Sequence, residues 1–274
     1  MSGDRRPIGV FDSGVGGLTV FRALEDALTD ESLVYLGDTA RVPYGTKSAE
    51  TVLRYSREAA RFLRSHDVKM IVVACNTASS VAMEAVAAES GVPAIGVIGP
   101  GARAAVARSA SKRIGVIGTR ATIHSGAYAL AIHAIAPDAE VVSRPCPLFV
   151  PLAEEGWTDD DIARRVAERY LDPLRKANID TLVLGCTHYP LLKSTLQRVA
   201  GDGVALVDSA ESVAAEVRAR LDADRDRAAP PGTAPLRRFF VTDAPGPFAD
   251  VAARFLGRAP EALDQADLAW HAER

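Results

Sequence analysis

Two cysteines in this chain each follow a short apolar run and precede small polar residues. Cys75 lies in IVVACNTAS, and Cys186 lies in LVLGCTHYP, two residues before His188. A thiol in such a setting can ligate zinc together with an imidazole, act as an activated nucleophile, carry a proton, or fill space in the core. The neighbouring residues do not decide among these chemistries, so we turn to the elements that position the two thiols.

The composition is that of a soluble globular protein: of 274 residues, 48% are hydrophobic and 24% are charged. The net charge of −3 comes without a dense block of Lys and Arg, which argues against direct nucleic-acid contact and favours small-molecule partners. The longest uncharged stretch, Ala121–Pro137, is shorter than the roughly 20 residues of a membrane helix. With no hydrophobic leader and no CxxC spacing, we expect a cytoplasmic protein with reduced thiols.

Short β-branched runs alternate with longer amphipathic segments, a pattern typical of parallel sheets covered by helices on both faces. The predicted strands are Ile8–Phe11, Leu33–Leu36, Met70–Ala74, Ala94–Ile98, Ile114–Ile117, Glu140–Val142, Thr181–Leu184 and Ala205–Val207. The predicted helices include Leu18–Leu28, Ala49–Ser65, Thr77–Ala88, Asp159–Lys176 and Leu191–Val199. Asp159 is the predicted N-cap residue of its helix, and Pro190 the predicted first-turn proline of the next.

An internal repeat relates the two halves of the chain. LRSHDVKMIVVACNTA aligns with LRKANIDTLVLGCTHY at the offset of 111 residues that places Cys75 on Cys186. Upstream, RPIGVFDSG resembles KRIGVIGTR at an offset of 106 residues. We therefore expect two pseudo-symmetric α/β domains of flavodoxin or Rossmann type, each with a thiol at the carboxyl end of a strand. Ligands of open parallel sheets bind at that edge, so the predicted site is the cleft between the domains.

Polar residues gather at the other predicted strand ends, where backbone N–H groups and helix dipoles favour anions. The stretch Asp12–Gly17, DSGVGG, lacks the GxGxxG spacing of a dinucleotide loop. Its glycines are equally compatible with a tight turn. Asp12 could cap the following helix, although its place at the end of the first strand favours a role in the site. This inventory suits a ligand with one or more carboxylates.

The duplicated thiols favour one chemistry over the others. Zinc would require Cys75, Cys186 and His188 to converge, and neither cysteine has the spaced partner of most zinc sites. Cys146, in RPCPLFVP, is expected to be a buried small hydrophobe. Nucleophilic catalysis needs one thiol with a base, whereas two thiols on opposite faces of a carbon can remove a proton and deliver another. The symmetric pair thus favours proton transfer with inversion.

At the level of motifs, the chain resembles the glutamate racemase family of the aspartate/glutamate racemase superfamily. The matching stretches are FDSGVGGLTV, GDTARVPYG, VVACNTAS, PLAEEG, LGCTHYPLL and RFFVTDAPGPF, which span nearly the whole chain. The resemblance implies a racemase that interconverts L- and D-glutamate with two thiols and no cofactor or metal. It also implies a homodimer, a supply of D-glutamate for peptidoglycan and, in some members, an effect on DNA gyrase.

Carried over by motif, Cys75 and Cys186 would be the alternating proton donor and acceptor, assisted by Asp12 and His188. The resemblance implies a substrate-binding set of Asp12, Ser13, Tyr44, Gly45, Asn76, Thr77, Glu154, Thr187 and His188. The alternative is a related member that acts on aspartate or another small carboxylate as a racemase, decarboxylase or isomerase. Two intact cysteine motifs argue against the one-thiol relatives.

Chain order suggests that residues 1–96 and 209–274 form the first domain and residues 97–208 the second. The charged, proline-containing stretch Asp222–Arg238 departs from the family pattern and is expected to be a linker before a final strand and helix.

Overall fold

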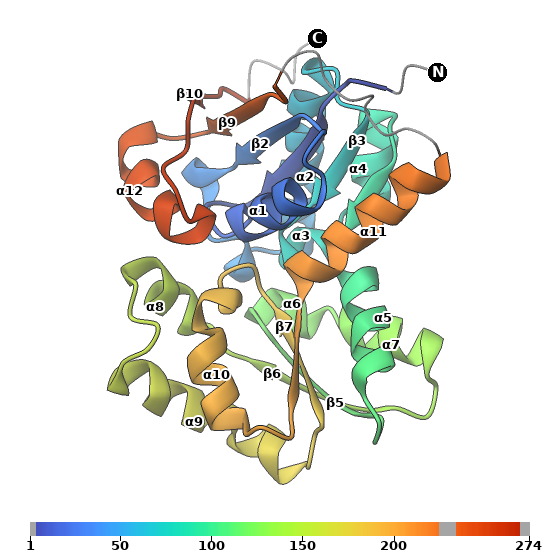
Figure 1. The fold of residues 1–274 in the computed structure, drawn as a ribbon, viewed down its shortest axis with the longest axis vertical. Coiled ribbons are helices and arrows are strands. Elements are labelled where there is room, and N and C mark those ends of the chain that lie inside the picture. The colour runs from blue at the N-terminus through green and yellow to red at the C-terminus, as the bar shows by residue number, and fades with distance from the viewer. Residues whose placement is uncertain (1–3, 225–233, 269–274) are drawn as a thin grey trace.

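The computed structural model describes residues 4–224 and 234–268, so most of the predicted linker, residues 225–233, lies outside the described part. The chain forms two parallel sheets with helices on both faces, one above the other in Figure 1. This confirms the predicted α/β class. The apolar strands lie at the buried centres of the sheets, and every residue is buried in β1 (Ile8–Asp12) and in β7 (Thr181–Gly185).

The larger sheet has six strands in the order β10-β9-β2-β1-β3-β4. Its strands are β1 (Ile8–Asp12), β2 (Leu33–Gly37), β3 (Met70–Val73), β4 (Ala94–Gly96), β9 (Arg237–Val241) and β10 (Leu263–Gln265). The last two strands come from the end of the described chain and lie in the upper half of Figure 1, β9 beside β2 and β10 beside β9. The polypeptide therefore returns to the first sheet after building the second.

The smaller sheet has four strands in the order β6-β5-β7-β8. They are β5 (Arg113–Gly118), β6 (Glu140–Pro145), β7 (Thr181–Gly185) and β8 (Ala205–Asp208). This order repeats β2-β1-β3-β4 of the larger sheet, and the register repeats with it. Ile8 pairs with Met70 between β1 and β3, and Ile114 pairs with Thr181 between β5 and β7. These pairs are related by the same two offsets, 106 and 111 residues, that align the sequence halves.

Helices connect the strands and cover both sheets. The α-helices are α1 (Leu18–Ala27), α2 (Ala49–Ser65), α3 (Asn76–Ser79), α4 (Met83–Ser90), α5 (Ile98–Arg108), α6 (Arg120–His124), α7 (Ala127–Ile135), α8 (Phe149–Glu155), α9 (Asp161–Lys176), α10 (Lys193–Ala200), α11 (Ser209–Asp224) and α12 (Pro245–Leu256). Three short 3-10 helices are η1 (Thr39–Arg41), η2 (Tyr44–Thr46) and η3 (Tyr189–Leu192). Helix α11 contacts both α1 and α5 and thus joins the two halves.

Some local predictions were wrong, each for an identifiable reason. The predicted helix Thr77–Ala88 is two helices, α3 and α4: after Ser79 the Val81 N–H donates to the Ala78 carbonyl, and the Thr77 carbonyl accepts from the Ser80 hydroxyl instead. Strand β4 ends before Ile98, which already belongs to α5. The N-cap of α9 is Asp160, whose carboxylate accepts from the Ala163 N–H, rather than Asp159.

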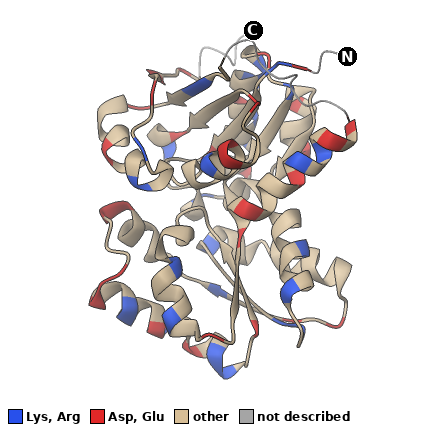
Figure 2. Cartoon of the chain, viewed as in Figure 1, with Lys and Arg blue, Asp and Glu red and all other residues tan. Residues whose placement is uncertain are grey.

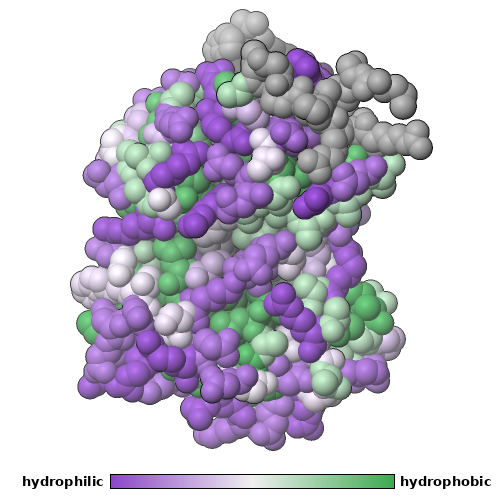
Figure 3. Space-filling model, in the orientation of Figure 1, coloured by the Kyte–Doolittle hydropathy of each residue, from purple (hydrophilic) through white to green (hydrophobic). Residues whose placement is uncertain are grey.

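The two halves share a core. The largest cluster of buried hydrophobic residues includes Val10 of β1 and Leu182 of β7, together with residues of α1 and α11. Within the described ranges, no helix is both long and apolar enough to cross a membrane. Lys and Arg are interspersed with Asp and Glu over both halves in Figure 2. The same face mixes hydrophilic and hydrophobic residues without a large uniform area of either (Figure 3).

Candidate active site

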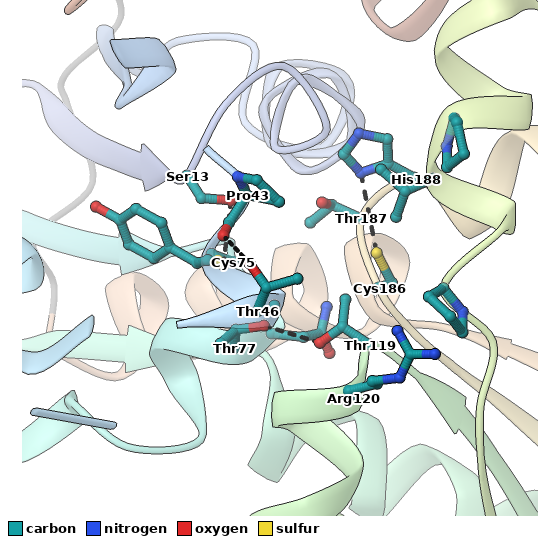
Figure 4. Close-up of a pocket in the computed structure, with 16 residues that line it drawn as sticks. Ser13, Pro43, Thr46, Cys75, Thr77, Thr119, Arg120, Cys186, Thr187 and His188 are labelled. Atoms are coloured by element: carbon teal, nitrogen blue, oxygen red, sulfur yellow. Dashed lines mark hydrogen bonds between the residues drawn. The ribbon is translucent and has the colours of Figure 1, made fainter. Parts of the chain in front are cut away.

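Cys75 and Cys186 line one cavity of about 180 Å³ between the two halves of the molecule. Figure 4 shows them on opposite sides of it, Cys75 with the first half and Cys186 with the second. The volume is below the roughly 300 Å³ of the smallest drug-sized pockets, so the cavity suits a small metabolite. Convergence of the two thiols, which the sequence repeat could only suggest, is a property of the tertiary structure.

The two thiols follow equivalent strands of the two sheets. Cys75 follows β3 and immediately precedes α3, and Cys186 follows β7 and precedes η3. β3 and β7 occupy equivalent positions in their sheets, so each thiol stands at the carboxyl end of a central strand. The strands are buried and well paired, which holds the thiols on rigid supports rather than on mobile loops.

Cys75 has an environment that keeps its proton. Its side chain is buried, and its Sγ lies 3.5 Å from the Ser13 Oγ. Burial, followed by the charge of Asp12, raises the pKa of Cys75 to about 12. Asp12 is fully buried; its Oδ2 accepts from the Gly14 N–H at 2.9 Å, and its Oδ1 has no partner within the described residues. Burial also raises the pKa of the Asp12 carboxyl.

Cys186 has a different partner. Its Sγ lies 3.9 Å from Nδ1 of His188, and Nε2 of His188 lies 2.9 Å from Oε1 of Glu154. Burial works to lower the pKa of His188, but the interactions with Cys186 and then Glu154 raise the pKa to about 10. The raised pKa favours the protonated form of the imidazole beside Cys186, whereas a buried carboxyl lies near Cys75. The two thiols are alike in place and unlike in electrostatics, an arrangement suited to an acid and a base.

Polar side chains complete the cavity wall. The hydroxyls of Thr77 and Thr119 are 3.0 Å apart and link the two halves (Figure 4). Asn76 accepts a hydrogen bond from the Tyr128 hydroxyl at Oδ1, while its Nδ2 is buried without a partner in the described residues. An unpaired buried amide N–H₂ is costly unless a ligand accepts from it, so Asn76 is poised to donate to a carboxylate.

Most of the residues that the resemblance implied line this cavity: Ser13, Tyr44, Gly45, Cys75, Asn76, Thr77, Cys186, Thr187 and His188. Asp12 and Glu154 do not. Glu154 lies behind His188 and is partly exposed, so the structure gives it no direct position for substrate binding. Tyr44 lines the cavity, but its hydroxyl donates to Asp38, and burial followed by the Asp38 charge raises the pKa of Tyr44.

Several lining residues were not in the predicted substrate-binding set: Pro43, Thr46, Thr119, Arg120, Pro147, Val150 and Pro151. The repeat contained a signal for one of them, since the offset of 106 residues places Ser13 on Thr119. Arg120 is exposed at the start of α6 and is not in an ion pair within the described residues. No local pattern marks it, because an arginine after a strand is ordinarily a solvated charge.

The glycines of DSGVGG are required by close packing. A Cβ on Gly16 would lie 2.3 Å from the Thr187 Oγ1, and one on Gly17 would lie 2.3 Å from the Asp12 Cβ. Neither glycine has a positive φ, so the turn itself does not require them. Gly45 likewise faces Thr119 across the cavity, 2.7 Å from a built Cβ. Gly16 and Gly45 thus let the two halves approach closely enough to form one cavity, whereas Gly17 makes room for Asp12 within the first half.

The described residues contain no group of three or more His, Cys, Asp or Glu side chains arranged to hold a metal ion. The charged side chains on the cavity wall are Arg120 and His188, both contributed by the second half of the chain. Their positive charge, together with backbone and hydroxyl donors, favours an anionic ligand.

Known proteins similar to this chain share its sequence and fold. The model of the Asp/Glu/hydantoin racemase family matches residues 8–217. The chain is 55% identical over 252 residues to a glutamate racemase of Geobacter metallireducens, covering 92% of this chain and 93% of that one. A Francisella tularensis glutamate racemase solved with D-glutamate is 40% identical, with a TM-score of 0.90 and coverage of 97% and 98%. A Thermus thermophilus enzyme solved with β-chloro-D-alanine is 47% identical, with a TM-score of 0.87 and the same coverage.

Proposed function

This chain belongs to the Asp/Glu/hydantoin racemase family, and we propose that it interconverts L- and D-glutamate by proton transfer at Cα. The observation that carries this proposal is that Cys75 and Cys186, at the carboxyl ends of equivalent strands in the two halves, line a single small cavity. Its relatives named as glutamate racemases, one of them solved with D-glutamate, supply the substrate that geometry alone would not.

The reaction needs one thiolate and one thiol at the moment of proton transfer. The thiolate removes the Cα proton from one face, leaving a carbanionic centre whose charge spreads into the substrate carboxylate. The opposite thiol then delivers its proton to the other face, and the configuration is inverted. The thiol and the thiolate have now exchanged roles, so the same pair can run the reverse reaction.

The surroundings of the two thiols differ, which supports different roles for them in the proton transfer. The high pKa of Cys75, caused by burial and by Asp12, favours a neutral thiol there in the free enzyme. The protonated His188 stabilises negative charge on Cys186 at 3.9 Å. We assign Asp12 and His188 as positioning residues beside Cys75 and Cys186, and Glu154 as the group that orients His188.

The cavity wall matches the charges of glutamate. Arg120 and the Asn76 amide can donate to carboxylates, as can backbone N–H groups at Ser13, Gly45 and Thr187. Tyr44 contacts the substrate through its backbone and ring, because its hydroxyl donates to Asp38. No carboxylate lines the cavity among the described residues, so the substrate ammonium meets neutral oxygen atoms.

The test follows the optical activity of L-glutamate on addition of the purified protein without metal, flavin or pyridoxal phosphate. The circular dichroism signal should decay to zero, and in ²H₂O deuterium should enter Cα starting from either enantiomer. A signal that persists, or a product other than glutamate in a screen that includes aspartate and arylmalonate, would assign the chain to another activity of the superfamily.

We further propose that the domains comprise residues 1–96 with 209–274 and residues 97–208, and that the cytoplasmic enzyme is a homodimer supplying D-glutamate to peptidoglycan. Limited proteolysis would test the division, and sedimentation of the purified protein would test the dimer. An effect on gyrase, implied by the resemblance, is separable from catalysis only if a variant lacking both Cys75 and Cys186 thiols retains it in a supercoiling assay.

A further inference from the structure

Tyr128, on α7 of the second half, holds the side chain of Asn76 in the first half. Its hydroxyl donates to the Asn76 Oδ1 at 2.7 Å, and both residues are 2% exposed. Asn76 lines the cavity, whereas Tyr128 does not. Tyr128 therefore acts on a bound ligand through Asn76 rather than by touching it.

The Tyr128 ring is fixed by close packing on both of its edges. A Cβ built on Gly101 of α5 would lie 3.2 Å from the Tyr128 Cε1, and one built on Gly185, directly before Cys186, would lie 3.0 Å from its Cε2. The ring thus fills the space that a larger residue would need at either glycine. The hydroxyl has a defined position that does not depend on its bond to Asn76.

The Tyr128 hydroxyl has two polar neighbours and a single proton. Burial raises the pKa of Tyr128, so the hydroxyl keeps this proton. The Ser209 Oγ lies 3.3 Å away and donates its own proton to the Leu184 carbonyl at 2.9 Å. The 2.7 Å contact with Asn76 has the usual length of an O–H···O bond, whereas an amide N–H would lie at about 2.9–3.0 Å. The Tyr128 proton therefore goes to the Asn76 oxygen.

This hydrogen bond decides which end of the Asn76 amide is left for a ligand. Since Oδ1 is engaged, the remaining group is Nδ2, which is buried without a partner among the described residues. A reversed amide would offer an oxygen in its place, and an oxygen repels a carboxylate. We infer that Tyr128 is a positioning residue that fixes the Asn76 amide with its N–H₂ group free to donate to a substrate carboxylate. The inference rests on the proposed function, which supplies the carboxylate ligand.

Tyr128→Phe removes this restraint and keeps the ring between Gly101 and Gly185. The Asn76 Oδ1 is then buried without a donor, so the amide gains by turning its oxygen toward the polar cavity. We expect kcat/KM for L-glutamate to fall about tenfold, the effect of leaving one buried polar group unsatisfied. The Kd of glutarate, which has two carboxylates and no ammonium, should rise by a similar factor.

A double-mutant cycle tests whether Tyr128 acts through Asn76. It compares wild type, Tyr128→Phe, Asn76→Ala and the double variant by kcat/KM for L-glutamate and by the Kd of glutarate from titration calorimetry. Once Asn76 is alanine, replacing Tyr128 should change either quantity by less than about twofold, because the group it orients is gone. A tenfold loss that persists in the Asn76→Ala background would overturn the inference, since Tyr128 would then support the fold in general.

Two controls separate orientation of the amide from the loss of a buried hydroxyl. Tyr189→Phe removes the hydroxyl of a fully buried tyrosine that donates to the Cys146 carbonyl at 2.9 Å. Urea unfolding should show a loss of stability comparable to that of Tyr128→Phe, with kcat/KM within a factor of two of wild type. Ser209→Ala removes the other neighbour of the Tyr128 hydroxyl and should also leave kcat/KM within a factor of two.

Unchanged kinetics and glutarate binding in Tyr128→Phe, or an equal fall in kcat/KM in Tyr189→Phe, would refute the role of Tyr128. The proposed function fails separately. If wild-type protein does not racemise glutamate, the cycle in the Kd of glutarate still decides whether Tyr128 orients Asn76 toward a carboxylate. Wild-type protein that binds neither glutamate nor glutarate would overturn both.

Discussion

Gly16 of the first half and Thr187 of the second are packed so closely that no side chain fits between them. A Cβ built on Gly16 lies 2.3 Å from the Thr187 Oγ1 and 2.4 Å from Nδ1 of His188. The loop DSGVGG is thereby pressed against the segment that carries Cys186. The distance between the thiol-bearing strand ends depends on this contact, because it sets how closely the two halves approach.

We therefore expect Gly16→Ala to lower both stability and activity. The added methyl must displace Thr187 or His188, and such overpacking typically costs about 1–3 kcal/mol. Urea unfolding would measure the loss, and kcat/KM would fall together with it because the groups that move line the cavity. Gly246→Ala is the control: nothing lies within 4 Å of its built Cβ, so activity and stability should be close to wild type.

Removal of either thiol should abolish racemisation while leaving part of the proton chemistry. Because general acid–base groups contribute about 10²–10⁴-fold, Cys75→Ala and Cys186→Ala should each lower kcat by at least that range. Each variant should still exchange Cα hydrogen with ²H₂O from one enantiomer faster than from the other, as followed by NMR. Cys146→Ala, a buried cysteine outside the cavity wall, should retain activity. Normal racemisation by both single variants would refute the two-thiol mechanism.

Protonation of His188 should make the unfolding free energy depend on pH. Its pKa rises from 6.5 to about 10 in the folded protein, so the folded state binds the proton more tightly than the unfolded state. The stabilisation is complete below pH 6.5, decreases as the pH rises, and is lost above about pH 10. The difference in unfolding free energy between wild type and His188→Gln should follow this course. A difference independent of pH over that window would contradict it.

Arg120 should contribute to capture of the anionic substrate. Arg120→Met should raise KM for glutamate by up to about fivefold, the range of an exposed charge pair, with little change in kcat. The effect should shrink as salt is added, because the charge is exposed and screened. Arg165→Met, which removes an exposed arginine on α9, is the control and should leave KM unchanged. A KM defect in Arg120→Met that persists at high salt would indicate a buried, direct contact instead.

Much of the architecture was predictable because it rests on local patterns. Unbroken apolar strands such as Met70–Val73 must be covered on both faces, and this requirement specifies parallel α/β layers. The offset between Cys75 and Cys186 also predicted equivalent strands, and the observed register repeats that offset. The break between α3 and α4 was missed because it is confined to one turn, where the Val81 N–H donates to the Ala78 carbonyl.

By itself, the sequence determined the type of fold and the two thiol-bearing strand ends, because burial and strand periodicity are encoded residue by residue. Only the tertiary structure decided that both thiols share one cavity, that Glu154 lies behind His188, and that Thr77 meets Thr119 across the two halves. These relationships connect residues far apart in the chain across the two halves. They depend on how closely the halves pack, which the glycines permit and which no local pattern records.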